Sequence, residues 1–224
     1  MRTTPAVLVF DVNETLSDMT PMKNAFTESG LHETLSRVWF AELLRDGFAL
    51  TTTGENPAFL DIASDSLHRL LTQTLGPGNY QNQTNHIMGV FKNLPLHPDV
   101  APGIRKLNTI TQLVTLSNGS PSVAESLTSR GGIRDKFSRL LSVQDAPCWK
   151  PAAEAYRYVS RQTGHAPGDL MLVAVHPWDI HGAKTAGLQT AWINRSATAY
   201  PSYYAQPDVE AQDIIELART LQTT

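Results

Sequence analysis

The sequence has little of three features that would point to other classes of protein: cysteine, charge of one sign, and long hydrophobic runs. Its single cysteine, Cys148, cannot form an internal disulfide, which fits a reducing compartment. The formal net charge is −3 and both signs are mixed along the chain, so no basic surface for nucleic acid is expected. No apolar run approaches the roughly 18 residues of a membrane helix, and Met1–Pro5 do not resemble a signal sequence. These absences predict a cytoplasmic protein that binds neither nucleic acid nor membrane.

Five short apolar runs, rich in Val, Leu and Ile without polar alternation, are typical of strands that are buried on both faces. They are Ala6–Phe10, Leu113–Leu116, Leu140–Val143, Met171–Val175 and Ala191–Ile193. Helix-like segments lie between the last four, at about Pro121–Arg130, Ala152–Thr163 and Asp179–Ala186. This alternation of strands and helices predicts an α/β fold with a parallel sheet covered by helices.

The interval between the first two predicted strands differs, because it contains only helical patterning. The segments 32–50 and 59–75 each carry apolar residues on broadly one stripe. About 75 residues are too many for one crossover connection and enough for a small helical bundle. The segment 94–98 has the composition of a linker that returns to the core. We therefore expect an α/β core domain made of residues 1–16 and 96–224, with a helical cap domain at 17–95.

Polar side chains follow several of the predicted strands. Asp11 and Ser117 come directly after the first two, the group from His176 to Asp179 follows the fourth, and Lys150 follows the third by a short loop. Because ligands bind outside the carboxyl ends of parallel strands, these groups should share one crevice. A lysine beside Asp11 would hold it ionised, and Asp179 could orient or deprotonate water. The pattern predicts nucleophilic catalysis by a carboxylate.

Four short motifs in this order resemble those of the haloacid dehalogenase superfamily, and their spacing covers nearly the whole chain. They are Asp11-x-x-x-Thr15, Leu116-Ser117-Asn118-Gly119, Lys150-Pro151, and Trp178-Asp179 with Gly182-Ala183. The 2-haloacid dehalogenase branch of the superfamily is more similar still. It shares the run from Leu116 to Pro121, Tyr156 after Lys150-Pro151, and the late Trp192-Ile193-Asn194-Arg195. The resemblance implies a Rossmann-like parallel sheet core with an inserted helical cap.

For this branch the resemblance implies a two-step hydrolysis of a small halogenated carboxylate without a metal or other cofactor. The nucleophile Asp11 displaces halide from C2 and forms an ester, which water then cleaves to a 2-hydroxy acid. In the implied roles Thr15 orients Asp11, Lys150 pairs with it, Tyr156 supports the lysine and Asp179 positions the water. Ser117 and Asn118 would hold the substrate carboxylate, and the further substrate contacts expected are Asn13, Phe40, Phe59 and Trp178. Members of this branch are often dimeric, so the resemblance also implies a homodimer.

The phosphatases of the same superfamily are the alternative within the fold. They carry an acid two residues after the nucleophile, where it protonates a leaving alcohol. Asn13 occupies that position here and cannot act as a general acid. Halide leaves without a proton, so Asn13 favours dehalogenation. A Mg²⁺-dependent small-molecule phosphatase and a non-catalytic relative stay open as alternatives.

The position of the halide-binding arginine departs from the dehalogenase pattern. The branch carries this arginine on the second cap helix, directly after a Leu-Trp pair. Here Phe40 follows Val38-Trp39, while Arg37 and Arg45 lie nearby but out of register. The change bears on the substrate more than on the type of reaction.

Two further departures fall beside the predicted nucleophile. The branch usually has Ser-Ser-Asn at the end of the fourth strand, where this chain has Ala174-Val175-His176. Because histidine titrates near neutrality, we predict that His176 holds or deprotonates the hydrolytic water. Glu14 replaces a glycine, and the sequence does not show whether its side chain points into the site.

Overall fold

The computed structural model describes residues 4–222, and within this range six parallel strands form one sheet in the order β3-β2-β1-β4-β5-β6. The strands are β1 (Val7–Phe10), β2 (Gln112–Ser117), β3 (Arg139–Ser142), β4 (Leu170–Ala174), β5 (Gln189–Ile193) and β6 (Val209–Ala211). The predicted α/β fold with a parallel sheet is confirmed, and the five predicted strands correspond to β1 to β5. The edge strand β6 was not predicted, because its three residues are too few to form an apolar run.

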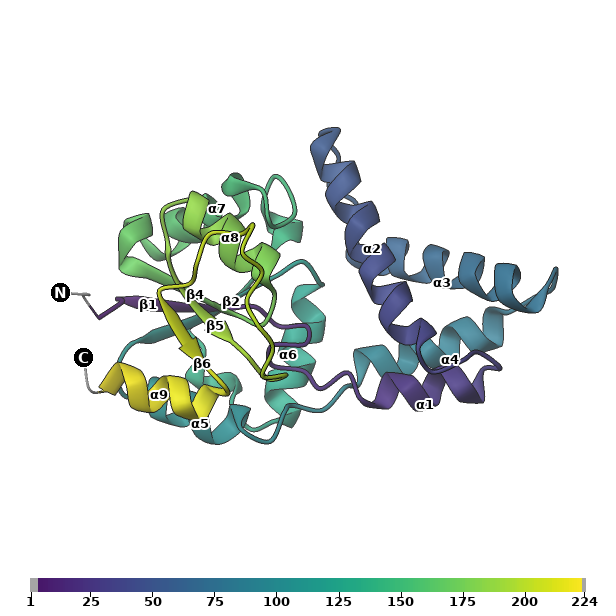
Figure 1. Ribbon diagram of the computed structural model, residues 1–224, viewed down its shortest axis with the longest axis horizontal. Helices are drawn as coiled ribbons and strands as arrows, with labels where there is room; N and C mark the ends of the chain where they lie inside the picture. Colours follow the sequence, from purple (N-terminus) through teal and green to yellow (C-terminus); the bar gives the residue numbers. More distant parts are fainter. Residues whose placement is uncertain (1–3, 223–224) are drawn as a thin grey trace.

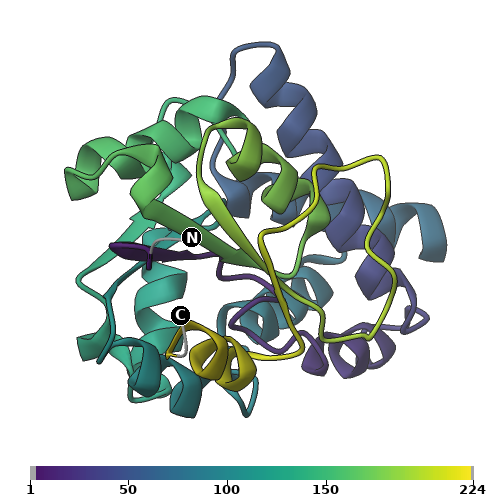
Figure 2. The same cartoon turned by 60° about the vertical axis from the view of Figure 1, so that its left-hand side comes forward.

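Helices cover both faces of this sheet, which explains why the strand sequences do not alternate (Figures 1 and 2). The helices of the core are α5 (Val100–Leu107), α6 (Pro121–Arg130), α7 (Ala153–Thr163), α8 (Pro177–Thr185) and α9 (Ile214–Gln222). Successive side chains of a strand point to opposite faces. In β1, Val9 packs into the same cluster as α7 and α8, whereas Leu8 packs with α5, α6 and α9. Both faces of β1 are therefore buried.

Between β1 and α5, where every residue is described, four helices form the cap that the sequence predicts. They are α1 (Pro21–Glu28), α2 (Leu35–Thr52), α3 (Phe59–Leu75) and α4 (Gln81–Lys92). The indole of Trp39 in α2 donates a hydrogen bond to the Ala63 carbonyl of α3 (3.2 Å), so these two helices are also joined by a polar contact. Within residues 4–222, no helix combines the length and the apolar character needed to cross a membrane.

The two chain segments that connect cap and core lie side by side. Ser17 and Leu96 form an isolated antiparallel bridge. The amide of Asp18 donates to the Pro95 carbonyl (2.8 Å), and the amide of His97 donates to the Leu16 carbonyl (3.0 Å). This pairing brings the two ends of the insertion together, so the cap leaves the sheet undisturbed. We retain 17–95 as the proposed extent of the cap and 1–16 with 96–224 as the proposed core.

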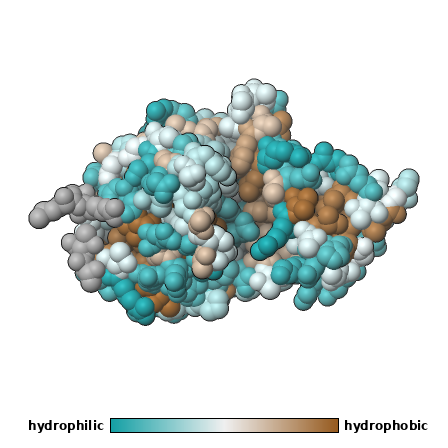
Figure 3. Space-filling view, in the orientation of Figure 1, coloured by the Kyte–Doolittle hydropathy of each residue, from teal (hydrophilic) through white to brown (hydrophobic). Residues whose placement is uncertain are grey.

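The cap packs onto the core at Trp149, the residue before Lys150. The Trp149 ring is fully buried and stacks on Phe59 of α3, with ring centroids 5.6 Å apart. Its indole N–H donates to the Pro57 carbonyl (3.0 Å). A Cβ atom on Gly47 of α2 would lie only 2.3 Å from a ring carbon of Trp149. Gly47 therefore lets the backbone of α2 reach the core at this point. Figure 3 shows that the surface is hollowed between the cap and the core.

We predict that Gly47→Ala lowers the free energy of unfolding by about 1–3 kcal/mol, because the added methyl group overpacks the contact with Trp149. Gly89→Ala in α4 is the matched control, since no atom lies within 4 Å of its Cβ position. There the better helix propensity of alanine should raise stability by about 0.5–1 kcal/mol. Urea unfolding of the three proteins measures both changes. Equal stability of the two variants would contradict the close packing of Gly47.

Candidate active site

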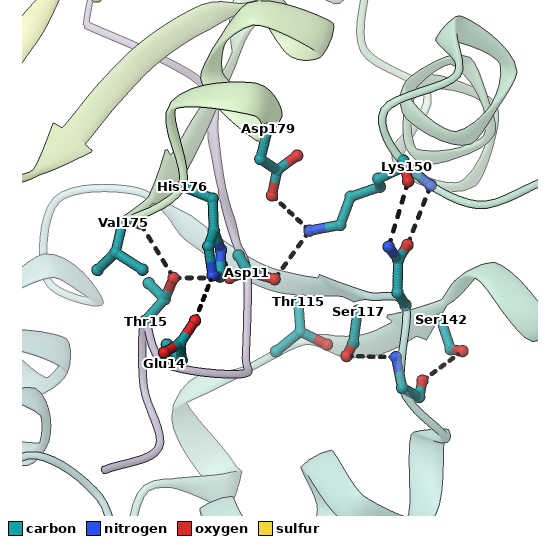
Figure 4. A network of polar contacts seen from close by, with 12 residues as sticks. Asp11, Glu14, Thr15, Thr115, Ser117, Ser142, Lys150, Val175, His176 and Asp179 are labelled. Carbon is teal, nitrogen blue, oxygen red and sulfur yellow. Dashed lines mark hydrogen bonds and ion pairs between the residues drawn. The ribbon is translucent and has the colours of Figure 1, made fainter. Parts of the chain in front are cut away.

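Asp11 lies at the carboxyl end of β1 and forms the centre of a buried polar network (Figure 4). Its Oδ1 atom accepts a hydrogen bond from Lys150 Nζ (2.9 Å). Its Oδ2 atom accepts from the Thr15 hydroxyl (2.7 Å) and lies 3.1 Å from His176 Nδ1. Burial alone would raise the pKa of Asp11, but the charge of Lys150 and the hydrogen bond from His176 hold it well below its usual range. The group is therefore an ionised carboxylate, as a nucleophile must be.

Lys150 supplies a positive charge between two carboxylates. Its ammonium group is fully buried and lies 2.9 Å from Asp11 Oδ1 and 2.5 Å from Asp179 Oδ2. Burial opposes the charge, yet the two carboxylates raise the pKa of Lys150 above its ordinary value. The Asn118 side chain brackets the Lys150 backbone: its Nδ2 donates to the Lys150 carbonyl (3.2 Å), and its Oδ1 accepts from the Lys150 amide (3.0 Å). Asn118 thus fixes where the lysine side chain begins.

Asp179 lies in the first turn of α8 and is completely buried. Its Oδ2 atom accepts from Lys150, and its Oδ1 atom accepts from the Tyr156 hydroxyl at 2.6 Å. Burial, together with the charge of Asp11, raises the pKa of Asp179. Tyr156 reaches this position because Gly182 in the next turn has no side chain; a Cβ there would lie 2.6 Å from the hydroxyl oxygen. The close approach of Tyr156 therefore explains why the motif Gly182-Ala183 has a glycine at its first position.

The loop after β1 is held from two other strands. The Thr15 hydroxyl accepts a hydrogen bond from the Val175 amide (3.1 Å) at the end of β4. Arg195, which follows β5, donates to the Thr15 carbonyl (2.8 Å) and forms an ion pair with Asp99 (2.7 Å). Arg195 belongs to a run already recognised in the sequence, but its support of the loop after β1 was not predicted. Its contact depends on the spatial meeting of β5 and the loop, which sequence spacing does not reveal.

Ser117 ends β2 and begins a tight turn. Its hydroxyl oxygen accepts from the Gly119 amide (2.9 Å), and the Gly119 carbonyl accepts from the Ser142 hydroxyl (2.8 Å). Asn13 is buried close to this turn, with its Nδ2 atom 3.5 Å from the position that a Cβ on Gly119 would take. Asn13, Ser117 and Asn118 thus lie near one another beside Asp11 and Lys150.

The aromatic candidates fall into two places. Phe40 and Phe59 are both buried in the cap, with ring centroids 6.5 Å apart. Phe59 also stacks on Trp149, so this cluster adjoins the residue before the lysine. Trp178 lies instead over the network: its ring stacks on His176 at 5.0 Å and lies 5.8 Å from Lys150 Nζ.

Glu14 points into the site, which answers the question that the sequence left open. Its Oε2 atom lies 2.8 Å from Nε2 of His176, whose other ring nitrogen faces Asp11. Burial would lower the pKa of His176, but hydrogen bonds to Asp11 and Glu14 and the charges of these carboxylates raise it to about 10. The imidazole therefore carries two protons at neutral pH and donates to both. The two residues that differ from the dehalogenase pattern on this side of the site contact each other.

A cavity of about 450 Å³ opens between the cap and the 194–201 loop of the core, next to this pair. Glu14 and His176 line one wall, and Arg37 of α2 lines the cap side. Arg45, the other arginine near the expected halide position, is exposed and pairs with Glu42 and Asp46. Of the two arginines, Arg37 therefore contacts the cavity beside the site.

The arrangement around Asp11 does not fit a divalent metal ion. Within residues 4–222, no three His, Cys, Asp or Glu side chains are grouped so that they could hold a metal. Both oxygens of Asp11 accept hydrogen bonds from protein donors, and Asp179 is bonded to Lys150 and Tyr156. Two positive charges already lie against Asp11, and a third would be repelled.

Comparisons with known proteins identify the class. A family model described as haloacid dehalogenase-like hydrolase matches residues 5–187, and the chain belongs to this family. It is 26% identical over 215 residues to an (S)-2-haloacid dehalogenase of Pseudomonas putida, which covers 94% of this chain and 95% of the relative. It is also 26% identical over 207 residues to a haloacetate dehalogenase of Moraxella sp. (strain B), with 90% and 91% covered. The structure of L-2-haloacid dehalogenase from Xanthobacter autotrophicus has the same fold, with a TM-score of 0.88, 23% identity, and 97% and 98% covered.

We predict that Lys150→Met lowers the free energy of unfolding by about 3–5 kcal/mol at neutral pH, because two buried carboxylates lose their shared counter-ion. Without the lysine, the pKa of Asp179 in the folded state would rise further above its unfolded value. The folded variant then binds more protons than the unfolded chain, so its deficit should shrink as the pH falls.

Urea unfolding at several pH values measures this deficit against wild type. Lys184→Met is the control, because it removes the partly exposed ion pair with Asp208 and should cost no more than about 1 kcal/mol. A deficit for Lys150→Met that matches the control, or that does not change with pH, would contradict the charge arrangement.

Proposed function

We propose that the protein hydrolyses short 2-haloacids to 2-hydroxy acids through an ester on Asp11. The observation that carries this proposal is the buried Asp11–Lys150–Asp179 chain, in which the ionised carboxylate of Asp11 accepts a single hydrogen bond, from Lys150, at its Oδ1 atom. The likeness to dehalogenases along nearly the whole chain supports the same reaction.

In the first step, Oδ1 of Asp11 attacks C2 of the substrate and the bond to the halogen breaks. Thr15 and His176 hold Oδ2 from the other side, which fixes the rotation of the carboxylate. We propose that the turn at Ser117 and Asn118, with Asn13 beside it, receives the substrate carboxylate. Phe40, Phe59 and Trp178 are the proposed apolar surroundings of the carbon chain.

In the second step, water adds to the carboxyl carbon of the esterified Asp11. The oxyanion forms on Oδ2, where the Thr15 hydroxyl can stabilise it, and Lys150 stays next to Oδ1, where it can stabilise the departing alkoxide. Asp179 and Tyr156 keep the ammonium group in place through the bonds described above. Collapse of the oxyanion releases the 2-hydroxy acid and restores the Asp11 carboxylate.

The phosphatase alternative is less well supported by the same geometry. Asn13 has no proton to give to a leaving alcohol, and the donors around Asp11 leave it poorly suited to a magnesium ion. A homodimer, as the resemblance implies, stays a proposal.

The test of this function is halide release from chloroacetate and 2-chloropropionate in the presence of EDTA. We expect stoichiometric formation of halide and 2-hydroxy acid, because the residues that we assign to the reaction need no metal. Phosphate release from phosphate esters that depends on added Mg²⁺, without halide release, would instead support the phosphatase. A wild-type protein that turns over neither class would favour the non-catalytic relative.

We predict that Asp11→Asn lowers halide release by several orders of magnitude, because an amide is a far poorer nucleophile than a carboxylate. The protein should stay folded, since asparagine has the same shape: its oxygen can still accept from Lys150, and its amide nitrogen can donate to the Thr15 hydroxyl oxygen. Intact mass must show that the asparagine has not deamidated. Near-normal turnover by such a verified variant would rule out Asp11 as the nucleophile.

A further inference from the structure

The hydrolytic water needs a base, and the buried carboxylate of Asp179 is poorly placed to be that base. Its side chain has no exposed surface, and each of its oxygens already accepts a short hydrogen bond, from Lys150 (2.5 Å) and Tyr156 (2.6 Å). Solvent therefore does not reach it. A base for the second step is better sought where water can approach Asp11.

Water can approach from the cavity beside Glu14 and His176. The side chains of these residues are 38% and 12% exposed, and both line the cavity of about 450 Å³. That volume holds several water molecules. His176 Nδ1 is 3.1 Å from Asp11 Oδ2, so a water next to this nitrogen would also be next to the carboxyl carbon of Asp11.

We propose that Glu14 and His176 form a carboxylate–histidine dyad in which His176 takes a proton from the water that cleaves the Asp11 ester, while Glu14 positions the ring. The proposal rests on the ester mechanism proposed above. Its geometry is that of other hydrolytic dyads: a carboxylate accepts from the far nitrogen of the ring (2.8 Å), and the near nitrogen faces the reacting group.

The backbone of Glu14 supports a functional role for its side chain. Its φ angle is 62°, in the left-handed region where glycine is favoured. A side chain at such a position is strained, and strain of this kind gathers at functional sites. Here the strained residue is the one that aims a carboxylate at His176.

The charge on Asp11 would determine when His176 can act as a base. In the resting site the ring donates to both carboxylates, and its pKa of about 10 keeps it protonated. Lys150 lies beyond Asp11, Trp178 stacks on the ring, and Arg37 and Arg195 line the same cavity. Esterification removes the charge of Asp11 and lowers the pKa of His176, so the Nδ1 proton can pass to water in the cavity. His176 becomes a base only after the first step.

The protons then balance over the second step. Nδ1 of His176 takes one proton of the attacking water as its oxygen bonds to the carboxyl carbon of Asp11. When the bond between that carbon and Oδ1 breaks, Oδ1 leaves with the product as an alkoxide, which takes the other proton of the water. Asp11 is again a carboxylate, His176 is again doubly protonated, and the 2-hydroxy acid keeps the former Asp11 oxygen as its hydroxyl.

The test separates the two steps in the wild type and three variants, with chloroacetate and 2-chloropropionate as substrates. Rapid mixing gives the halide released in the first turnover, and mass spectrometry after an acid quench gives the fraction of Asp11 that carries the ester. For Glu14→Gln we expect a near-normal halide burst, accumulated ester, and steady-state turnover lowered about tenfold or more. Glu14→Gly should behave alike and fold readily, because glycine relieves the strained backbone.

Asp18→Asn is the matched control, since it loses another carboxylate that lines the same cavity. Asp18 accepts from the Thr20 amide, and asparagine can do the same. A pH profile of ester breakdown shows whether Glu14 positions and polarises the His176 ring or only stabilises the fold. The acid limb should move to lower pH in Glu14→Gln, because loss of a carboxylate partner lowers the pKa of His176 in the ester.

Three results would overturn the dyad: no ester in either Glu14 variant, a halide burst that falls in parallel with turnover, or accumulated ester with an unmoved acid limb. A wild-type protein that forms no ester and releases no halide would overturn the proposed function, and the dyad with it. Wild-type halide release together with unaffected Glu14 variants would overturn the dyad alone.

Discussion

The buried ammonium group of Lys150 is the interaction on which the site depends. Asp11 and Asp179 come from β1 and α8, far apart in the sequence, and both carry their oxygens into a region that solvent hardly reaches. Two carboxylates at such depth repel each other, and burial opposes the charge of each. The positive charge of Lys150 between them offsets both the repulsion and the cost of burial. The asparagine that brackets its backbone and the tyrosine that bonds Asp179 both serve to hold that lysine in place.

Much of the fold was accessible from the sequence because it follows from patterns of local composition. Strands buried on both faces leave non-alternating apolar runs, and helices α6 and α7 were predicted almost to the residue. Helix α8 begins at Pro177, two residues before the predicted start, because proline suits the first turn of a helix. The strand β6 left no signal, since three residues at a sheet edge form no recognisable run.

In the candidate site, too, some features could be predicted from the sequence and others could not. Asp11, Ser117, Lys150 and Asp179 could be named because each lies at the end of a strand or in the segment that follows one, and the parallel topology brings these strand ends together. The direction of the Glu14 side chain could not be predicted, because it depends on a left-handed backbone at that one residue. The support that Arg195 gives to Thr15 was hidden for another reason, since it joins two loops separated by about 180 positions. Contacts of this kind belong to the assembled fold rather than to any local pattern.

The seating of the cap on Trp149 has a consequence for exchanging parts between members of the family. The Trp149 indole packs against the cap, and the next residue is Lys150. The contact with the cap therefore also fixes the position of the loop that carries the ammonium group. A foreign cap grafted at the paired linkers would need a helix with a glycine facing that ring, and a carbonyl for the indole N–H. Without them the graft would displace the loop that carries the lysine. The cap and the lysine loop are thus coupled at this contact, and a chimera should exchange residues 47–59 together with the 147–151 loop.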